Sequence, residues 1–180
     1  MPGSLLLAAP TLLDPSFVDA VVLVLDAGSD GALGVVVNRV AQTPVHAVLP
    51  AWTDLVGPPG LLFAGGPVET DGALAVALRR TAGDRPGLRD VAGGLALLDL
   101  DAVPASLEDD VAQLRIFAGY AGWGAGQLEA EVAHGDWYVV PGTASDVFRA
   151  DPTGLRRDVL RRQPGELAWL ATRPVDPDVN

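Results

Sequence analysis

The strongest constraint on the fold comes from two apolar runs that stand close together in the chain. The run AVVLVL occupies residues 20–25, and LGVVV occupies residues 33–37. Because neither run alternates apolar with polar residues, each is predicted to be a central strand covered on both faces. The turn residues DAGSDG at 26–31 indicate that the two strands pair as an antiparallel hairpin. The chain must therefore fold around this hairpin and cover both of its faces.

The remaining pattern adds further strands and helices. Strands are predicted at 5–9, 61–64, 73–78, 95–98, 113–117 and 136–140. Helices are predicted at 43–49, 126–134, 151–163 and 167–171. Thr43 and Asp151 are the expected N-caps of two helices, each followed by proline at the first helical position. Residues 79–90 are the most polar stretch and are predicted to be a surface loop. We expect one α+β domain over residues 1–180.

Composition excludes several classes of protein. The 180 residues contain no cysteine, which removes disulfides, thiolate metal sites and cysteine nucleophiles. All 12 basic residues are arginine, so a Walker A lysine and Schiff-base chemistry are excluded as well. The net charge of −11 opposes binding to a phosphate backbone, so no direct nucleic-acid partner is expected.

No segment resembles a membrane span or an export signal. The apolar runs are much shorter than the roughly 20 residues that cross a bilayer. The apolar stretch at 5–13 has no basic residue before it and contains Pro10, unlike a secretory signal. We therefore expect a cytoplasmic protein without a membrane partner.

A glycine-rich segment at 119–126 carries four glycines directly before a predicted helix. Amide groups at a helix N-terminus can hold an anion, but this spacing matches neither the dinucleotide fingerprint nor the Walker motif. We interpret the segment as a turn from strand to helix. Gly122 and Gly126 are the positions where a positive φ or a close backbone contact is expected. No cofactor is predicted.

The helix at 126–134 places Gln127, Glu131 and His134 in one stripe. Glu131 and His134 have the Glu-x-x-His spacing that di-iron bundles use from two helices. This chain has one such copy and only two histidines, so a solvent-exposed face with a side-chain pair explains the stripe better. No metal site is predicted.

The tryptophans and arginines receive separate interpretations. Trp137 and Trp169 are expected in the core, whereas Trp123, in the glycine-rich turn, is expected to be exposed, with a place in the core as the alternative. Exposed aromatic side chains often anchor interfaces, which makes Trp123 a candidate for binding a partner. The helix at 151–163 carries four arginines that are expected on a solvent face, with docking of an acidic partner as the alternative: Arg156, Arg157, Arg161 and Arg162.

The order of several short motifs resembles that of the AlgH/YqgE family of small bacterial proteins. The motifs are GSLLLAAP at 3–10, DPSF at 14–17, GALGVVVNR at 31–39, GGPV at 65–68, GYAGWGAGQLEAE at 119–131 and DW at 136–137. The resemblance extends from Gly3 to about Trp169, and the stretch from Gly122 to Glu131 is its most specific part. It implies an α+β domain with a mixed, bifurcated β-sheet curled into a pseudo-barrel and flanked by helices.

The resemblance implies no established reaction. The family name records a proposed regulatory link to alginate production in pseudomonads. Members commonly carry proline where Val40 stands, and histidines that the stretches around Asp26 and 76–78 lack here. Any role of those histidines therefore does not carry over to this chain.

Three functions are compatible with these observations. The leading hypothesis is a noncatalytic binding or regulatory module whose partner is an unidentified protein or small ligand. Its candidate surface is Asn38, Trp123, Gln127 and Glu131, although Asn38 at the end of an apolar strand is also a suitable turn cap. The second hypothesis is an enzyme that uses Glu131 or a nearby aspartate as acid and base. The third, a DNA-associated regulator, is disfavoured by the net charge.

Overall fold

The computed structural model describes residues 1–171 of the chain, so residues 172–180 of the expected domain lie outside the described part. The strands are β1 (Ser4–Ala8), β2 (Val21–Gly28), β3 (Gly31–Val36), β4 (Val40–Pro44), β5 (Leu61–Ala64), β6 (Val68–Arg79), β7 (Leu88–Ala92), β8 (Leu95–Leu98), β9 (Val111–Gly124) and β10 (Trp137–Pro141). The α-helices are α1 (Val45–Val48), α2 (Gln127–His134), α3 (Ala144–Val147), α4 (Leu155–Arg161) and α5 (Glu166–Leu170), and two 3₁₀ helices are η1 (Pro50–Leu55) and η2 (Pro104–Ser106). No helix within residues 1–171 has both the length and the apolar character needed to cross a membrane.

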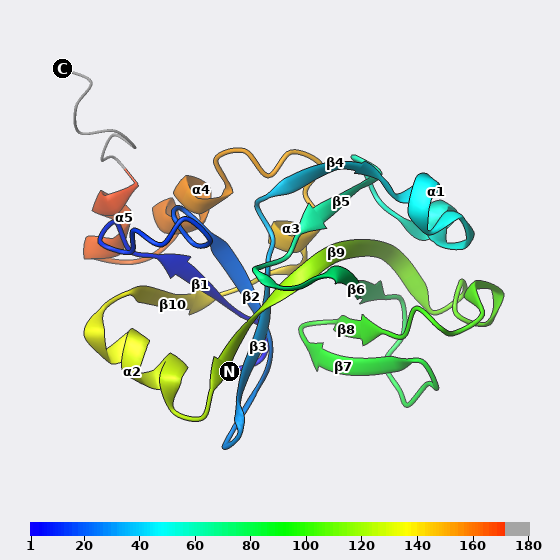
Figure 1. Ribbon diagram of the computed structural model, residues 1–180, viewed down its shortest axis with the longest axis horizontal. Coiled ribbons are helices and arrows are strands. Elements are labelled where there is room, and N and C mark those ends of the chain that lie inside the picture. Colours follow the sequence, from blue (N-terminus) through cyan, green and yellow to red (C-terminus); the bar gives the residue numbers. More distant parts are fainter. Residues whose placement is uncertain (172–180) are drawn as a thin grey trace.

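The predicted central hairpin is confirmed. β2 and β3 pair antiparallel, with Val22 opposite Val36. They lie inside the strand order β10-β1-β2-β3-β9-β6-β8-β7 (Figure 1). Residues 21–25 are all buried, as a strand covered on both faces requires.

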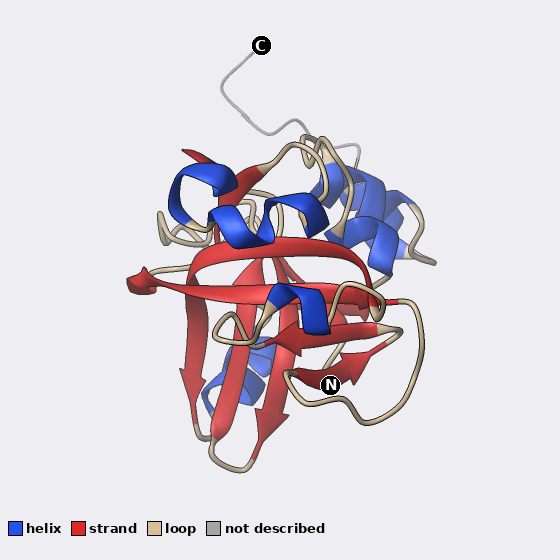
Figure 2. Ribbon diagram, turned by 90° about the vertical axis from the view of Figure 1, so that its right-hand side faces the viewer, coloured by secondary structure: helices blue, strands red, loops and turns tan. Residues whose placement is uncertain are grey.

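The sheet divides at the long strand β9. On one edge, β9 pairs with β6. On the other edge it pairs in parallel with β5 at Phe117 and Ala118, and then antiparallel with β3 between Ala121 and Gly124. Because β5 and β3 succeed one another along the same edge, the sheet is bifurcated, and the parallel pairing of β5 with β9 makes it mixed. Figure 2 shows that the strands curl rather than lie flat, and this confirms the expected α+β fold.

The expected turn from strand to helix after Gly119 is wrong. β9 continues through Gly119, which has a φ of +71°, and ends at Gly124. A Cβ atom at Gly119 would lie 2.6 Å from the carbonyl oxygen of Gly66. The glycine therefore admits the backbone of the β5–β6 connection beside the strand. The turn into α2 is confined to Ala125 and Gly126, and Gly126 has the expected positive φ, at +73°.

Three apolar clusters join the sheet to its helices. On one face, Leu23 of β2 belongs to the same cluster as Leu155 of α4. On the other face, Val22 shares a cluster with Leu128 of α2. A third cluster surrounds Trp52 of η1 and packs on β6, β8 and β9. Because neighbouring residues of β2 enter different clusters, α4 and α2 cover opposite faces of the central strands.

The predicted helix starts need correction. Thr43 lies in β4, and α1 begins at Val45 after Pro44, without a side-chain cap. The Asp151 carboxylate accepts a hydrogen bond of 2.8 Å from the N–H of Thr153. It therefore forms a turn that precedes α4, which begins at Leu155. Both errors arise because a short polar residue before proline suits a turn or strand end as well as a helix cap.

The predicted surface loop at 79–90 is shorter than expected. Arg79 is the last residue of β6, and residues 88–90 belong to β7. β7 escaped prediction because Arg89 and Asp90 lie exposed at the edge of the sheet, where a strand keeps polar side chains.

Candidate functional site

Trp123, Gln127 and Glu131, which the sequence places in one candidate surface, do come together. Oε2 of Glu131 accepts hydrogen bonds from the indole N–H groups of Trp123, at 2.9 Å, and Trp137, at 2.8 Å. Oε1 of Glu131 accepts a third bond, of 2.9 Å, from the amide of Gln127. Gln127 in turn accepts the backbone N–H of Gly124 at 3.0 Å. Three donors therefore converge on one carboxylate.

The expectation that Trp123 is exposed is wrong. Its exposed fraction is 6%, because β9 continues past Gly119 and places the indole on the sheet face that α2 covers. The ring centroid lies 6.3 Å from that of Phe17 and 6.0 Å from that of Trp137. This aromatic cluster and the carboxylate of Glu131 together fix α2 against β9 and β10. Trp123 therefore anchors helix α2 to the sheet.

Trp137 is buried as predicted, whereas Trp169 is not in the core. Trp169 lies on α5 with an exposed fraction of 76%. The short helix α5 instead turns Leu167 and Leu170 toward the apolar cluster. A helix of five residues can bury only one narrow side, and its apolar content alone did not show which.

Asn38 lies apart from the tryptophans and holds a different corner of the fold. Its side-chain amide donates to the carbonyl oxygen of Asp19 at 2.9 Å and accepts the N–H of Val21 at 2.9 Å. Asp19 has a left-handed backbone, with a φ of 56°. The next residue, Arg39, donates to the carbonyl oxygens of Ser16, at 2.6 Å, and Val18, at 2.8 Å. Asn38 therefore acts as a turn cap, which is the alternative role predicted from its position at the end of an apolar strand. Together with Arg39 it fixes the loop at 14–19.

A cavity of about 350 Å³ opens beside this corner, and we call it the Asn38 pocket. Its apolar wall is formed by Leu155, Leu160, Leu170 and Ala171. Its polar side chains are Asp19, Asn38, Thr153, Arg156 and Arg157. The pocket therefore lies between the fixed loop and the helices α4 and α5.

The two arginines of the Asn38 pocket differ in how they are held. Nε and Nη2 of Arg156 donate to the carbonyl oxygen of Ala8, and Nε lies 3.9 Å from Oδ1 of Asp19. Arg157 is exposed and has no hydrogen bond or ion pair within residues 1–171. Arg156 and Arg157 were both predicted to lie on a solvent face. Their position between Leu155 and Leu160 on the same helix was the sequence signal that this face borders an apolar wall.

A family model described as AlgH-like matches residues 5–168. The chain belongs to the AlgH-like family. It is 51% identical over 182 residues to a UPF0301 protein of Streptomyces coelicolor, which covers 99% of this chain and 94% of that protein. A UPF0301 protein of Mycobacterium tuberculosis is 46% identical over 177 residues, covering 97% of this chain and 88% of that protein.

Two solved structures share the fold of this AlgH-like chain. A crystal structure of a Corynebacterium diphtheriae protein aligns with a TM-score of 0.90 at 32% identity, covering 96% of this chain and 92% of that one. The solution structure of the AlgH protein from Pseudomonas aeruginosa aligns with a TM-score of 0.69 at 25% identity, covering 96% and 93%. These matches establish the family and the fold, and they identify no ligand, partner or reaction.

The motifs that carry the resemblance to the AlgH-like family form one connected structure. Phe17, from the motif at 14–17, packs on both Trp123 and Trp137. Asn38 and Arg39 hold the same loop from its other side. Segments far apart in the sequence thus meet at the loop that ends at the Asn38 pocket.

Arg115 is a buried cation that the sequence analysis missed. Its exposed fraction is 2%, and burial lowers its pKa to about 10. The guanidinium donates to the carbonyl oxygens of Val147, at 2.6 Å, and Pro58, at 2.7 Å, and lies 4.1 Å from the ring centroid of Phe63. It therefore ties β9 to α3 and to the loop before β5. In sequence it reads as an ordinary polar residue of a strand.

Glu131 and His134 do not form a metal site together. Nδ1 of the exposed His134 contacts Oδ1 of Asp136 at 2.9 Å, while Glu131 faces the indoles. Residues 1–171 contain no group of three or more potential metal ligands. The stripe predicted on α2 is therefore divided between two separate contacts.

Proposed function

We propose that this AlgH-like protein is a cytoplasmic binding module rather than an enzyme, with its ligand in the Asn38 pocket. One observation carries the proposal: a single cavity combines an apolar wall with an exposed arginine that has no partner in the described chain. The wall includes Leu155, Leu160 and Leu170, and the arginine is Arg157. Small-molecule sites are typically concave, mostly apolar and equipped with a few polar groups that orient the ligand.

The chemistry of the lining favours a small amphipathic anion. The guanidinium of Arg157 offers a planar set of N–H donors that matches a carboxylate or phosphate group. Leu170 is partly exposed and provides contact area for an alkyl or aryl body, whereas Leu155 and Leu160 are themselves buried. The carboxylate of Asp19 at the rim repels negative charge. We therefore expect the anionic group on the side of Arg157 and the apolar body against α4 and α5.

Binding fits this lining better than catalysis does. The lining residues within the described part of the chain include no histidine, tyrosine or glutamate. The enzyme hypothesis centred on Glu131 receives little support, since both of its oxygens already accept N–H donors. Residues of α4 and α5 line the pocket, so a bound ligand would change the surface that these two helices present. A ligand-dependent surface of this kind is how binding would give the protein a regulatory role.

The test uses octanoate as the probe, because it combines a carboxylate with an alkyl chain. We titrate it into the ¹⁵N-labelled full-length chain and follow the backbone amides by NMR. We expect saturable shifts at residues 153–160 and 170–171. Arg157→Ala should weaken binding about 10-fold, which corresponds to about 1.4 kcal/mol. Arg161→Ala is the matched control, since Arg161 is exposed on the same helix and lies outside the pocket.

The outcomes separate the two parts of the proposal. Saturable binding that Arg157→Ala weakens and Arg161→Ala leaves unchanged supports both the pocket and the ligand class. Equal binding of octanol would retain the pocket and remove the role of Arg157. If neither probe shifts the pocket amides up to its solubility limit, the pocket is not a ligand site.

A further inference from the structure

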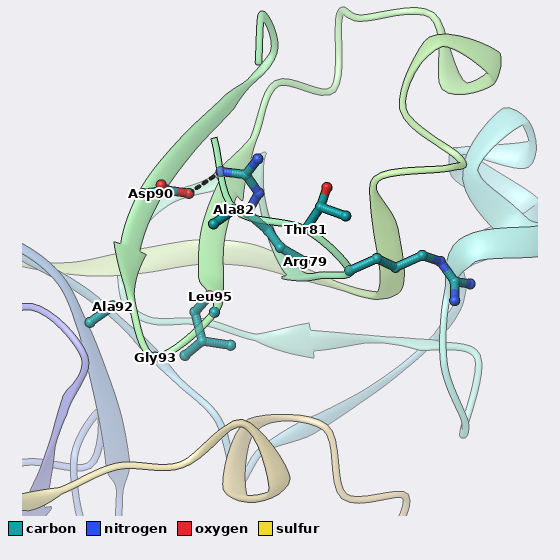
Figure 3. A pocket seen from close by; sticks show the side chains of 9 residues that line it. Arg79, Thr81, Ala82, Asp90, Ala92, Gly93 and Leu95 are labelled. Carbon is teal, nitrogen blue, oxygen red and sulfur yellow. Dashed lines mark hydrogen bonds and ion pairs between the residues drawn. The ribbon is translucent and has the colours of Figure 1, made fainter. Parts of the chain in front are cut away.

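A second cavity shares no lining residue with the Asn38 pocket. It measures about 360 Å³ and is bounded by the end of β6 and the turn between β7 and β8 (Figure 3). Its lining includes Arg79, Arg80, Asp90, Gly93 and Gly94. We infer that this cavity binds a small tetrahedral oxyanion such as inorganic phosphate.

The first observation is an unsatisfied donor on Arg79. The Arg79 side chain has an exposed fraction of 4%. One terminal nitrogen contacts the carboxylate of Asp90, as the dashed line in Figure 3 marks, and the other donates to the carbonyl oxygen of Gly83 at 2.7 Å. Nε is buried and is the one such side-chain nitrogen or oxygen in residues 1–171 that lacks a hydrogen-bond partner. Native proteins rarely leave a buried donor unpaired, so an acceptor from outside the chain is expected here.

The second observation is a pair of free backbone donors at the same place. Gly93 and Gly94 form the two-residue turn between Ala92 and Leu95, and both have positive φ angles, of +59° and +81°. The carbonyl oxygen of Gly94 accepts the backbone N–H of Arg79 at 2.9 Å, which fixes the turn beside that arginine. The N–H groups of both glycines donate to no acceptor in the described chain. Backbone N–H groups of this kind commonly bind anions.

The lining of this cavity is positively charged, which is the third observation. The lining carries two arginines and one aspartate, a balance of one positive charge in a chain whose net charge is −11. Arg80 is exposed and donates from Nε to the carbonyl oxygen of Val111 at 3.1 Å, so its guanidinium is held on the side of β9 and adds positive charge to the cavity wall. Guanidinium and amide donors together suit an anion with several acceptor oxygens. The strong negative charge of the whole chain opposes an extended polyanion or an anionic membrane, which leaves a small oxyanion.

The test is a phosphate titration of the ¹⁵N-labelled full-length chain, at constant ionic strength maintained with sodium chloride. The signals to follow are the Nε–Hε group of Arg79 and the amides of Gly93 and Gly94. We expect these three signals to shift and to saturate together. Arg80→Gln should weaken phosphate binding about 10-fold, and Arg161→Gln is the matched control that should not change it.

Asp90→Asn gives the opposite expectation and guards against a general loss of structure. Asp90 is exposed, so its replacement leaves the fold intact while it removes the negative charge beside Arg79. Phosphate should then bind about 10-fold more tightly. Shifts that do not saturate, an equal effect of chloride, or an unchanged affinity in Asp90→Asn would each overturn the inference. Because octanoate and phosphate address different residues, failure here leaves the Asn38 pocket untouched.

Discussion

The indole N–H of Trp123 donates a hydrogen bond of 2.9 Å to Oε2 of Glu131. Trp123 belongs to β9 and Glu131 to α2, so this bond joins the longest strand to the helix that follows it. The same oxygen accepts the indole N–H of Trp137 on β10 at 2.8 Å. One carboxylate thus links three consecutive elements, and its loss is the first perturbation to test.

Glu131→Gln should lower the free energy of unfolding by about 1–3 kcal/mol. Glutamine replaces one carboxylate oxygen with an N–H₂ donor, so the side chain no longer accepts all three hydrogen bonds. Urea denaturation followed by circular dichroism measures the change. Glu129→Gln, at an exposed position of the same helix, should change stability by less than about 0.5 kcal/mol. Equal losses in both variants would contradict the anchoring role.

Trp123→Ala should destabilise the fold by about 3–5 kcal/mol, because it removes a buried ring that packs on Phe17 and Trp137. Trp123→Phe retains an aromatic ring and loses only the hydrogen bond to Glu131 together with part of the contact area. Its cost should therefore be smaller, at about 1–3 kcal/mol. Thermal and urea unfolding of both variants test this order. A loss below about 1 kcal/mol for Trp123→Ala would place the indole outside the core.

These tryptophans show what sequence patterns can and cannot establish here. The central hairpin was predictable because an unbroken β-branched run has few other places in a fold. The burial of Trp123 was not, because it depends on β9 continuing through Gly119, and that continuation is stabilised by pairing with the distant strand β3. Gln127 and Glu131 were correctly grouped because helical spacing is local.

The pocket residues illustrate the same limit. Asn38 bonds to residues 19 and 21, which lie on a different strand and loop, so residue type is the one local signal of its role as a cap. Nothing in the local sequence joins Asp19 to Arg156, since their contact depends on how α4 packs against the loop at 14–19. Only a fold brings such residues together.

Asn38→Ala should cost about 1–3 kcal/mol, because the buried N–H of Val21 loses its acceptor and the carbonyl of Asp19 loses a donor. Hydrogen exchange gives a site-specific readout, and the Val21 amide should lose protection more than the amides of β6. Gln42→Ala, at an exposed position whose side chain makes no hydrogen bond within residues 1–171, is the control. Unchanged exchange at Val21 in Asn38→Ala would show that another group holds this corner.

Two glycines of β9 should respond differently to alanine. Gly119→Ala places a Cβ atom in a backbone with positive φ and close to the carbonyl of Gly66, so a loss of more than about 1 kcal/mol is expected. At Gly122, expected from the sequence to be constrained, φ is not positive and the nearest atom to a Cβ is Cε2 of Tyr120 at 3.4 Å. Gly122→Ala should be neutral or add up to about 1 kcal/mol of stability. Paired urea titrations check the contrast, and similar losses at both positions would refute it.

Asp146 provides a prediction on pH dependence. Burial raises the pKa of this carboxyl, but hydrogen bonds from Arg162 and Thr143 outweigh burial and hold the pKa below its ordinary value. A lowered pKa in the folded state means that the carboxylate stabilises the fold fully above its unfolded pKa of about 3.9 and loses this effect as the pH falls through the folded value. The stability difference between wild type and Asp146→Asn should therefore be constant above about pH 5 and shrink below about pH 4. Urea denaturation across this range measures it, and a difference that grows on acidification would contradict the assignment.

The position of β1 has a consequence for how the chain is made. β1 lies between β2 and β10, and Leu7 pairs with both Val21 and Tyr138. During synthesis the first strands leave the ribosome well before β10, so one edge of β1 stays open while most of the chain emerges. An apolar strand with an open edge is a template for association with other chains. The nascent protein is therefore most vulnerable to aggregation until its final third has been translated, and chaperones that bind extended apolar segments would act on this stage.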